Sequence, residues 1–164
     1  MSIYDTESLL SDIKAALVAN LNTKIAAVEA EKIAGGFPTT GLASVDTTHG
    51  YFEQSWSDEL LNYSPAIFFG VEDVQAEGAG PATKQIIRIF VEVVLVDSGM
   101  DKLGKNRIHR YTRAIREVLQ TLYDRLPGGN KIKIETVRPV SFKVDLNSSE
   151  EIKVGGVSLT TALA

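Results

Sequence analysis

The sequence predicts an α+β fold: a mostly antiparallel or mixed β-sheet, two long helices packed on one of its faces, and a β-hairpin at the C-terminus. Three observations support this prediction. Apolar residues recur every three or four positions in 5–33 and in 101–126, as in amphipathic helices. They occupy alternate positions in 85–96 and 131–146, as in strands. The order of elements is helix, long loop, two strands, helix, strand and hairpin.

The length and composition are those of one globular domain. The chain has 164 residues, of which 44% are hydrophobic and 23% charged, so we expect a single domain over 1–164 with a buried core. The absence of cysteine excludes disulfides and thiolate metal sites. Residues 1–10 lack the basic and then apolar pattern of a secretory signal, and no apolar run approaches the ~20 residues that span a bilayer. We therefore expect no membrane association.

The first helix is expected from about Asp5 to Ile33. Asp5 or Thr6 can act as its N-cap, because a short polar side chain can accept a hydrogen bond from the first turn. Gly35-Gly36 and the proline that follows shortly afterwards end it. The apolar stripe of this helix is Leu10, Ile13, Leu17, Leu21, Ile25 and Val28.

Residues 34–63 show no clear period. They are rich in Gly, Thr, Ser and Asp, yet they contain aromatic residues that a solvated linker does not need: Phe37, Tyr51, Phe52, Trp56 and Tyr63. We predict a long loop, with or without a short hairpin, that packs on the body of the protein or on a partner.

Two strands are expected next. Residues 65–71 are typical of a short buried strand, 72–83 of a turn-rich connection, and 85–96 of a longer strand. From 87 to 95 the odd positions are all apolar, whereas the even positions include Arg88 and Glu92. Because a strand has a period of two, both charges lie on one face. We predict that this face is half-covered, with Arg88 and Glu92 pairing with a neighbouring strand or with another subunit.

The second helix is expected over about 101–126, with Ser98 or Asp101 as its N-cap. Its basic side chains lie on the arc opposite its apolar stripe, and "PGGN" at 127–130 ends it. The stripe consists of Ile108, Tyr111, Ile115, Val118, Leu119, Leu122 and Leu126.

The C-terminal third is predicted to be β-structure. Residues 131–146 alternate, and Pro139 indicates an edge position or a bulge, since proline cannot donate to a strand ladder. Residues 150–162 are expected to form a hairpin with Gly155-Gly156 as its tight turn. One predicted face of the strand 131–146 carries Ile132, Ile134, Val140, Phe142, Val144 and Leu146.

No catalytic, cofactor-binding or metal-binding motif is recognisable, so we predict no enzyme activity, no cofactor and no metal. The stretch "GAGPATKQ" at 78–85 lacks the ending of a phosphate-binding loop and precedes a strand rather than a helix. Asp46, His49 and either Ser44 or Ser55 have the composition of a catalytic triad, but such residues are common in polar loops.

One enzymatic or ligand-binding alternative remains open. In it, a small domain uses loop 37–64 to form its site, and Asp46, His49 and Trp56 line the pocket.

The charge is unevenly distributed, although the net charge is only −4. Residues 1–60 hold nine acidic and three basic side chains, whereas 101–125 hold seven basic and three acidic ones. Three interpretations of the basic helix stay open: a solvated face, a contact with the acidic N-terminal third of a neighbouring subunit, or direct contact with nucleic acid. The overall acidity argues against a sequence-specific DNA-binding protein.

The order of elements over residues 5–146 resembles that of the tail terminator (tail completion) proteins of tailed bacteriophages and related phage-like particles. The resemblance is most specific in "SPAIF" at 64–68, in "IFVEV" at 89–93 and in the helix "RIHRYTRAIREVLQTLY" at 107–123. One departure is the aromatic-rich insertion 34–63, which the smallest family members lack.

The resemblance implies a structural virion protein. Members of this family form a six-subunit ring that caps the finished tail tube, stops its growth and offers a docking surface to the neck. The implied partners are other copies of the chain, the tail tube protein and a neck or head-completion protein, while double-stranded DNA passes through the lumen without sequence-specific binding. The implied location is the virion tail or neck, after assembly in the cytoplasm of a bacterial host. A head–tail joining protein or a sheath-end protein is the alternative within this class.

A closed ring needs a heterologous interface, in which one patch of each subunit meets a different patch of the next. We expect the acidic N-terminal region to meet the basic helix there, with aromatic side chains as buried anchors. The residues predicted at the subunit or partner interface are Phe37, Tyr51, Phe52, Trp56, Arg88, Glu92, Arg107, Arg110 and Arg113.

Overall fold

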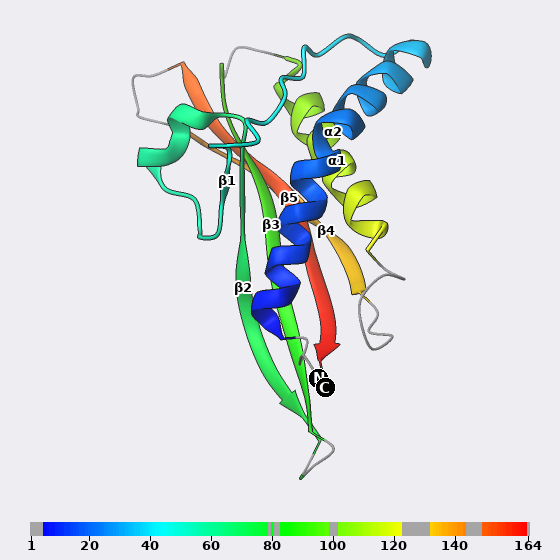
Figure 1. Ribbon diagram of the computed structural model, residues 1–164. Helices are drawn as coiled ribbons and strands as arrows, with labels where there is room; N and C mark the ends of the chain where they lie inside the picture. Colours follow the sequence, from blue (N-terminus) through cyan, green and yellow to red (C-terminus); the bar gives the residue numbers. More distant parts are fainter. Residues whose placement is uncertain are drawn as a thin grey trace.

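Two layers make up the protein. The computed structural model describes residues 5–78, 80, 83–98, 102–122, 132–143 and 149–163, with only the backbone of Asp58, Glu59 and Leu61. In this part of the chain, helices α1 (Thr6–Ala34) and α2 (Gly104–Gln120) form one layer and a five-stranded sheet the other (Figure 1). The predicted α+β class, with both helices on one face of the sheet, is confirmed.

The sheet is mixed, with the strand order β1-β2-β3-β5-β4. All neighbouring strands are antiparallel except β1 and β2, which are parallel. A 3-10 helix, η1 (Asp58–Tyr63), separates the first two strands. The strands are β1 (Tyr51–Phe52), β2 (Ala66–Glu77), β3 (Lys84–Ser98), β4 (Ile132–Lys143) and β5 (Glu150–Leu163).

The core lies between the helices and the sheet face that they cover, which we call the inner face. The odd-numbered residues of β3, from Ile87 to Leu95, are buried against the apolar stripes of both helices. Each such side chain contributes about 1.5–3 kcal/mol on burial. The predicted stripe of α1 is buried in full: Leu10, Ile13, Leu17, Leu21, Ile25 and Val28.

The ends of α1 are as predicted, whereas the start of α2 is not. Asp5 is the N-cap of α1 and accepts a hydrogen bond from the Ser8 amide at 2.9 Å. The helix ends at Gly35, and Gly36 follows with φ of 85°. Leu103 occupies the N-cap position of α2 without any side-chain hydrogen bond to the first turn. Ser98 instead ends β3, and Asp101 lies outside the described residues.

The second strand is longer than predicted. It continues through the predicted connection to Glu77, because a β-bulge between Val71 and Asp73 accommodates the extra residue. Beyond Gly70 every residue of β2 is exposed. With the start of β3, this part of β2 forms a ribbon that extends past the N-terminal end of α1 (Figure 1), and the end of β5 pairs with the other edge of β3 there.

The C-terminal hairpin is present, but β4 and β5 form it. The prediction that Gly155-Gly156 is its turn is wrong, because both glycines lie within the continuous strand β5. Their role is close packing. A Cβ atom at Gly155 would lie 2.8 Å from side-chain atoms of Ile108 and Thr112, and one at Gly156 would overlap the carbonyl oxygen of Val91.

A bulge also changes the predicted faces of β4. This strand lies at the edge of the sheet and its register shifts between Val137 and Val140, so both predictions from Pro139 are confirmed. The shift reverses which side chains face the helices. Ile134 pairs with Leu159 on the inner face, whereas Phe142 pairs with Ile152 on the opposite, outer face. The single predicted apolar face is therefore wrong, and Val144 and Leu146 lie outside the described residues.

Gly156→Ala tests the close-packing role of the second glycine. The added methyl group would overlap the backbone of β3, so we expect the free energy of unfolding to fall by about 1–3 kcal/mol. Urea unfolding would measure this. Ser158→Ala, on the same strand and face, is the control and should change it by less than about 0.5 kcal/mol. Equal stability of the two variants would contradict the packing argument.

Candidate functional site

A buried ion pair joins the two helices. The side chain of Arg110 is 5% exposed, and its Nη1 donates to Glu29 Oε2 at 2.6 Å. Glu29 also accepts the Thr40 amide at 2.6 Å and the Thr40 hydroxyl at 2.9 Å. The prediction that the basic residues of α2 all lie opposite its apolar stripe is therefore wrong for Arg110.

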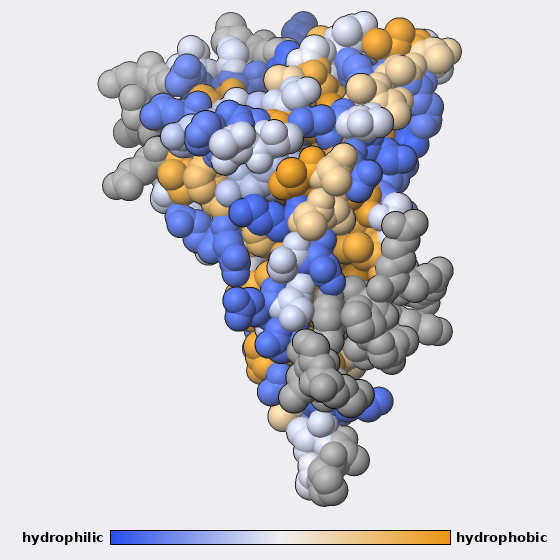
Figure 2. All heavy atoms as spheres, in the orientation of Figure 1, coloured by the Kyte–Doolittle hydropathy of each residue, from blue (hydrophilic) through white to orange (hydrophobic). Residues whose placement is uncertain are grey.

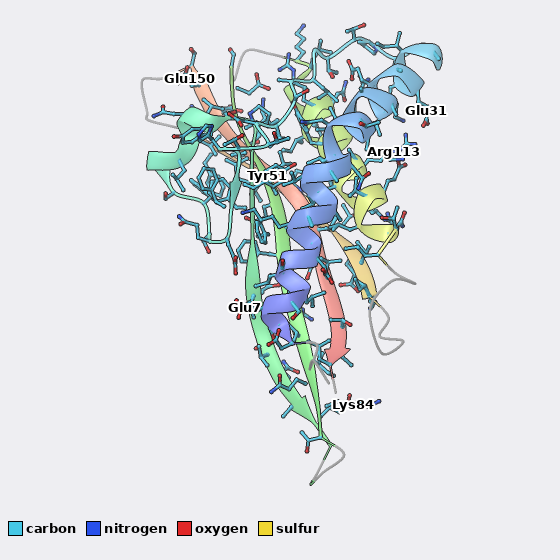
Figure 3. All side chains as sticks on the ribbon, viewed as in Figure 1. Glu7, Glu31, Tyr51, Lys84, Arg113 and Glu150 are labelled. Carbon is cyan, nitrogen blue, oxygen red and sulfur yellow. The ribbon has the colours of Figure 1, made fainter. Side chains whose placement is uncertain are left out.

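The other two candidate arginines on α2 are also paired within the chain. Arg113 donates to both oxygens of Glu31, at 3.0 and 2.7 Å, and the two residues face each other in Figure 3. Arg107 donates to both oxygens of Asp97, at 2.9 and 2.7 Å. The acidic N-terminal region thus meets the basic helix inside one chain, which leaves these guanidinium groups with intrachain roles.

The pKa of Glu29 reflects two opposing effects, burial and hydrogen bonding. Burial raises the pKa, but hydrogen bonds from the Thr40 amide, from Arg110 and from the Thr40 hydroxyl outweigh it, so the pKa lies below the ordinary value of 4.5. A carboxylate whose pKa is lowered by folding stabilises the folded state above its unfolded pKa. This stabilisation is lost as the pH falls through the folded pKa.

The loop after α1 is fixed to the helices by side-chain hydrogen bonds. Asn22 and the backbone of Val45 exchange two, at 2.9 and 2.8 Å. The Tyr111 hydroxyl donates to the Ala43 carbonyl at 2.7 Å, and the Tyr51 hydroxyl donates to the Leu17 carbonyl at 3.2 Å. Burial raises the pKa of Tyr51 to about 12. Tyr51 therefore serves to hold the loop on its own chain.

Asp46 and His49 form a turn. Asp46 Oδ1 accepts the amides of Thr48 and His49, and its Oδ2 lies 3.2 Å from His49 Nδ1. Both side chains are more than half exposed. In the described residues neither Ser44 nor Ser55 hydrogen-bonds to His49, so the arrangement is that of an Asx-type turn.

The outer face of the sheet carries a second, smaller apolar cluster, which buries Phe68, Val94 and Val154 among others. Two of the predicted aromatic anchors cover it from the same chain. The ring of Phe52 stacks on Phe68 with centroids 5.1 Å apart, and that of Trp56 lies 5.8 Å from Phe142. We predicted that the aromatic loop packs either on the body of the protein or on a partner. Phe52 and Trp56 pack on the body of the protein.

Phe37 lies elsewhere, beyond the C-terminal end of α1. It is 55% exposed, and Lys32 Nζ lies 4.9 Å from the centre of its ring. Ile33 beside it is 44% exposed. Apolar side chains gather at this end of α1 in Figure 2.

The rest of the outer face is only partly covered. Three apolar residues of the edge strand β4 remain exposed on the outer face. The sequence did not predict them as surface residues, because the bulge places two of them on this face. They are Val137, Val140 and Phe142, exposed by 44%, 47% and 46%. Large exposed apolar residues grouped on one strand are typical of a contact surface.

Glu92 lies half-buried on the same outer face. It is paired in register with Phe68 on β2 and with Gly156 on β5. Burial raises the pKa of its carboxyl group, and the negative charge of Glu72 raises it further. Among the described residues no basic side chain forms an ion pair with it. The predicted pairing with a neighbouring strand is therefore not found for Glu92. Arg88 forms no ion pair among the described residues either; the pKa of Glu135 on β4, two strands away, is lowered mainly by Lys133 and only slightly by the charge of Arg88.

Comparison with known proteins gave no match to any protein-family model and none to a curated protein. In the part of the chain that the structure describes, no three His, Asp or Glu side chains gather closely enough to hold a metal ion. None of the described helices has the length and apolar character needed to cross a membrane.

Glu29→Gln tests the buried ion pair. Without the carboxylate, Arg110 remains buried and unpaired, so we expect the free energy of unfolding to fall by about 3–5 kcal/mol at neutral pH. The pKa of Glu29 lies below 4.5 in the folded state. The difference in the free energy of unfolding between wild type and variant should therefore be largest above pH 4.5 and should disappear as the pH falls further. Denaturant unfolding across this pH range measures it.

The matched control is Glu31→Gln, which removes the exposed partner of Arg113. It should lower the free energy of unfolding much less than Glu29→Gln does, because the Glu31 side chain is 61% exposed and solvent screens its charge. If Glu29→Gln and Glu31→Gln lowered the free energy of unfolding equally at neutral pH, the pair of Arg110 and Glu29 would not be the buried interaction described above.

Glu92→Gln should stabilise the folded protein, whereas Glu29→Gln should destabilise it. Because folding raises the pKa of Glu92, its ionised form destabilises the folded monomer at neutral pH, and the uncharged amide removes this cost. We expect a higher free energy of unfolding at pH 7 and no difference once the pH is below 4.5. Glu77→Gln, at the exposed end of β2, is the control. A loss of stability at pH 7 would show that the Glu92 charge has a favourable partner within the chain.

Proposed function

We propose that this protein is a structural subunit that associates with copies of itself into a ring, caps the end of a phage tail tube and offers a docking surface to the neck. The observation that carries the proposal is the outer face of the sheet. There the exposed side chains of Val137, Val140 and Phe142 border the cluster that Trp56 covers. Glu92 lies half-buried on the same face without a basic partner among the described residues.

The outer face supports self-association for two physical reasons. Its exposed apolar residues lie together on an edge strand, so that a neighbour can remove them from water at about 25 cal/mol per Å². The half-buried carboxylate of Glu92 would gain a counter-charge if a basic side chain of the neighbour lay over it. Both features cost free energy in the isolated chain and would be relieved by a partner.

The family resemblance supports the rest of the proposal. It supplies the tail tube, the neck protein and the passage of double-stranded DNA as expected partners, and the virion tail or neck as the location. In a ring the outer face of one subunit would meet a different surface of the next. Phe37, beyond the C-terminal end of α1, is an exposed member of the predicted interface and a candidate for that complementary surface, whereas Arg88 is exposed on the outer face itself.

The test uses Val140→Asp together with Phe142→Asp. Two charges on the outer face should prevent association without removing core residues, because both side chains are nearly half exposed. We expect sedimentation velocity to show an oligomer for the wild type, alone or with tail tubes from the source particle, and a monomer for the variant. Electron micrographs should show capped tube ends only with the wild type.

Val74→Asp is the matched control, because Val74 is an apolar residue with 50% exposure on the ribbon formed by β2 and β3. It should associate as the wild type does. A wild-type chain that stays monomeric and leaves tube ends uncapped would overturn the proposal. Binding to the portal side rather than to the tube end would indicate a head–tail joining protein.

A further inference from the structure

A cationic pocket lies on the inner side of the sheet, where α2 begins. Its cavity has a volume of about 300 Å³. Three ammonium groups line it, from Lys102, Lys105 and Lys153, together with Ser141 on β4 and a single carboxylate, Glu151. The apolar inner face of the sheet thus becomes polar at this end.

Lys153 is the most unusual of these residues. It lies within β5 opposite Leu95, so its side chain projects toward the helix layer, and the residue is only 7% exposed. Its one ion pair is with Asp97 at 3.6 Å, which is too long for a hydrogen bond. Asp97 already accepts both hydrogen bonds of Arg107. Among the described residues the Lys153 ammonium therefore makes no hydrogen bond, although it carries three donors.

The N-terminus of α2 adds to the positive charge. The first turn of the helix contains no acidic residue, and the backbone N–H groups of a helix N-terminus carry a partial positive charge. Gly104 lies directly against the Lys153 ammonium, and any side chain at that position would overlap it. Among the described residues the buried ammonium has one carboxylate beside it, that of Asp97, which it shares with Arg107, so a further anion would stabilise it.

The two exposed lysines have no acidic partner in the described residues. Neither Lys102 nor Lys105 forms an ion pair there. With Lys153 they place three positive charges on the cavity, against Glu151 in its lining and Asp97 beside it. Among the described residues that line the cavity, three are basic and one is acidic, so positive charge is in excess there.

We propose that this pocket binds a phosphate group. Donors converge on it from β5, from the turn before α2 and from the first turn of α2, an arrangement that suits an oxyanion with several acceptor atoms. The volume admits an inorganic phosphate ion or one phosphate of a nucleic-acid backbone. The inference stands apart from the proposed ring, because it rests on a different face of the sheet and needs no second copy.

The test is an amide chemical-shift titration of the full chain with sodium phosphate at pH 7, with ionic strength held constant by sodium chloride. We expect saturable shifts of the Gly104 and Lys105 amides. The Lys102→Gln, Lys105→Gln double variant should weaken binding at least about tenfold, since it removes two of the three ammonium groups that line the cavity. Both positions are exposed, so the variant should fold as the wild type does.

Lys14→Gln with Lys84→Gln is the matched control, because these two lysines are also exposed but lie outside the pocket. It removes the same charge and should leave the affinity for phosphate unchanged. A linear, unsaturated shift would overturn the proposal, as would equal weakening by both double variants.

A second titration, with a short DNA duplex, identifies the source of the phosphate. Saturable shifts of the same amides by the duplex alone would assign the site to a nucleic-acid backbone. Shifts by inorganic phosphate would assign it to the free ion. An absence of saturable shifts with both ligands would exclude a phosphate site.

Discussion

The pairing of Arg110 with Glu29 is the interaction on which the arrangement of this protein depends. It joins α2 to the far end of α1, and through Thr40 it also fixes the start of the loop that leaves α1. That loop then reaches Tyr51 and Phe52, which lie in β1 against β2. A pair buried this deeply contributes little net stability compared with apolar residues of equal size, but it accepts few alternative geometries. Its effect is to fix where the loop goes.

Because the loop crosses from the helix layer to the other side of the sheet, the two faces of the sheet differ. The inner face is closed by two amphipathic helices, and its β3 residues from Ile87 to Leu95 are fully or almost fully buried. Among the described residues, the loop and η1 cover the outer face; they reach the cluster around Phe68 and, through Trp56, approach Phe142, but leave the apolar residues of the edge strand β4 nearly half exposed. The part of the outer face that the described residues leave exposed is where association is proposed.

Periodic elements were predictable from the sequence, and local exceptions to periodicity were not. The helices and β3 followed from spacing alone, as did the shared face of Arg88 and Glu92. The Gly155-Gly156 pair was misread because two adjacent glycines suit a tight turn and a close helix–sheet contact equally well. A helical wheel placed Arg110 among basic residues, since it cannot show that Glu29, 81 positions away, approaches it. The exposure of Phe142 depends on a bulge, and bulges leave little trace in an alternating sequence.

Two charges are poorly paired among the described residues after this arrangement, and each lies at one of the two proposed binding surfaces. Glu92 is a half-buried anion on the outer face, and Lys153 is a buried cation on the inner side. Folding cannot pair them with each other, because they project from opposite faces of the same sheet. Glu92 has no basic ion-pair partner among the described residues, and Lys153 shares the carboxylate of Asp97 with Arg107, so a ligand of opposite sign would stabilise each charge. Since the sheet separates the two sites, occupation of one leaves the other accessible, so a subunit interface and a phosphate site are compatible in one molecule.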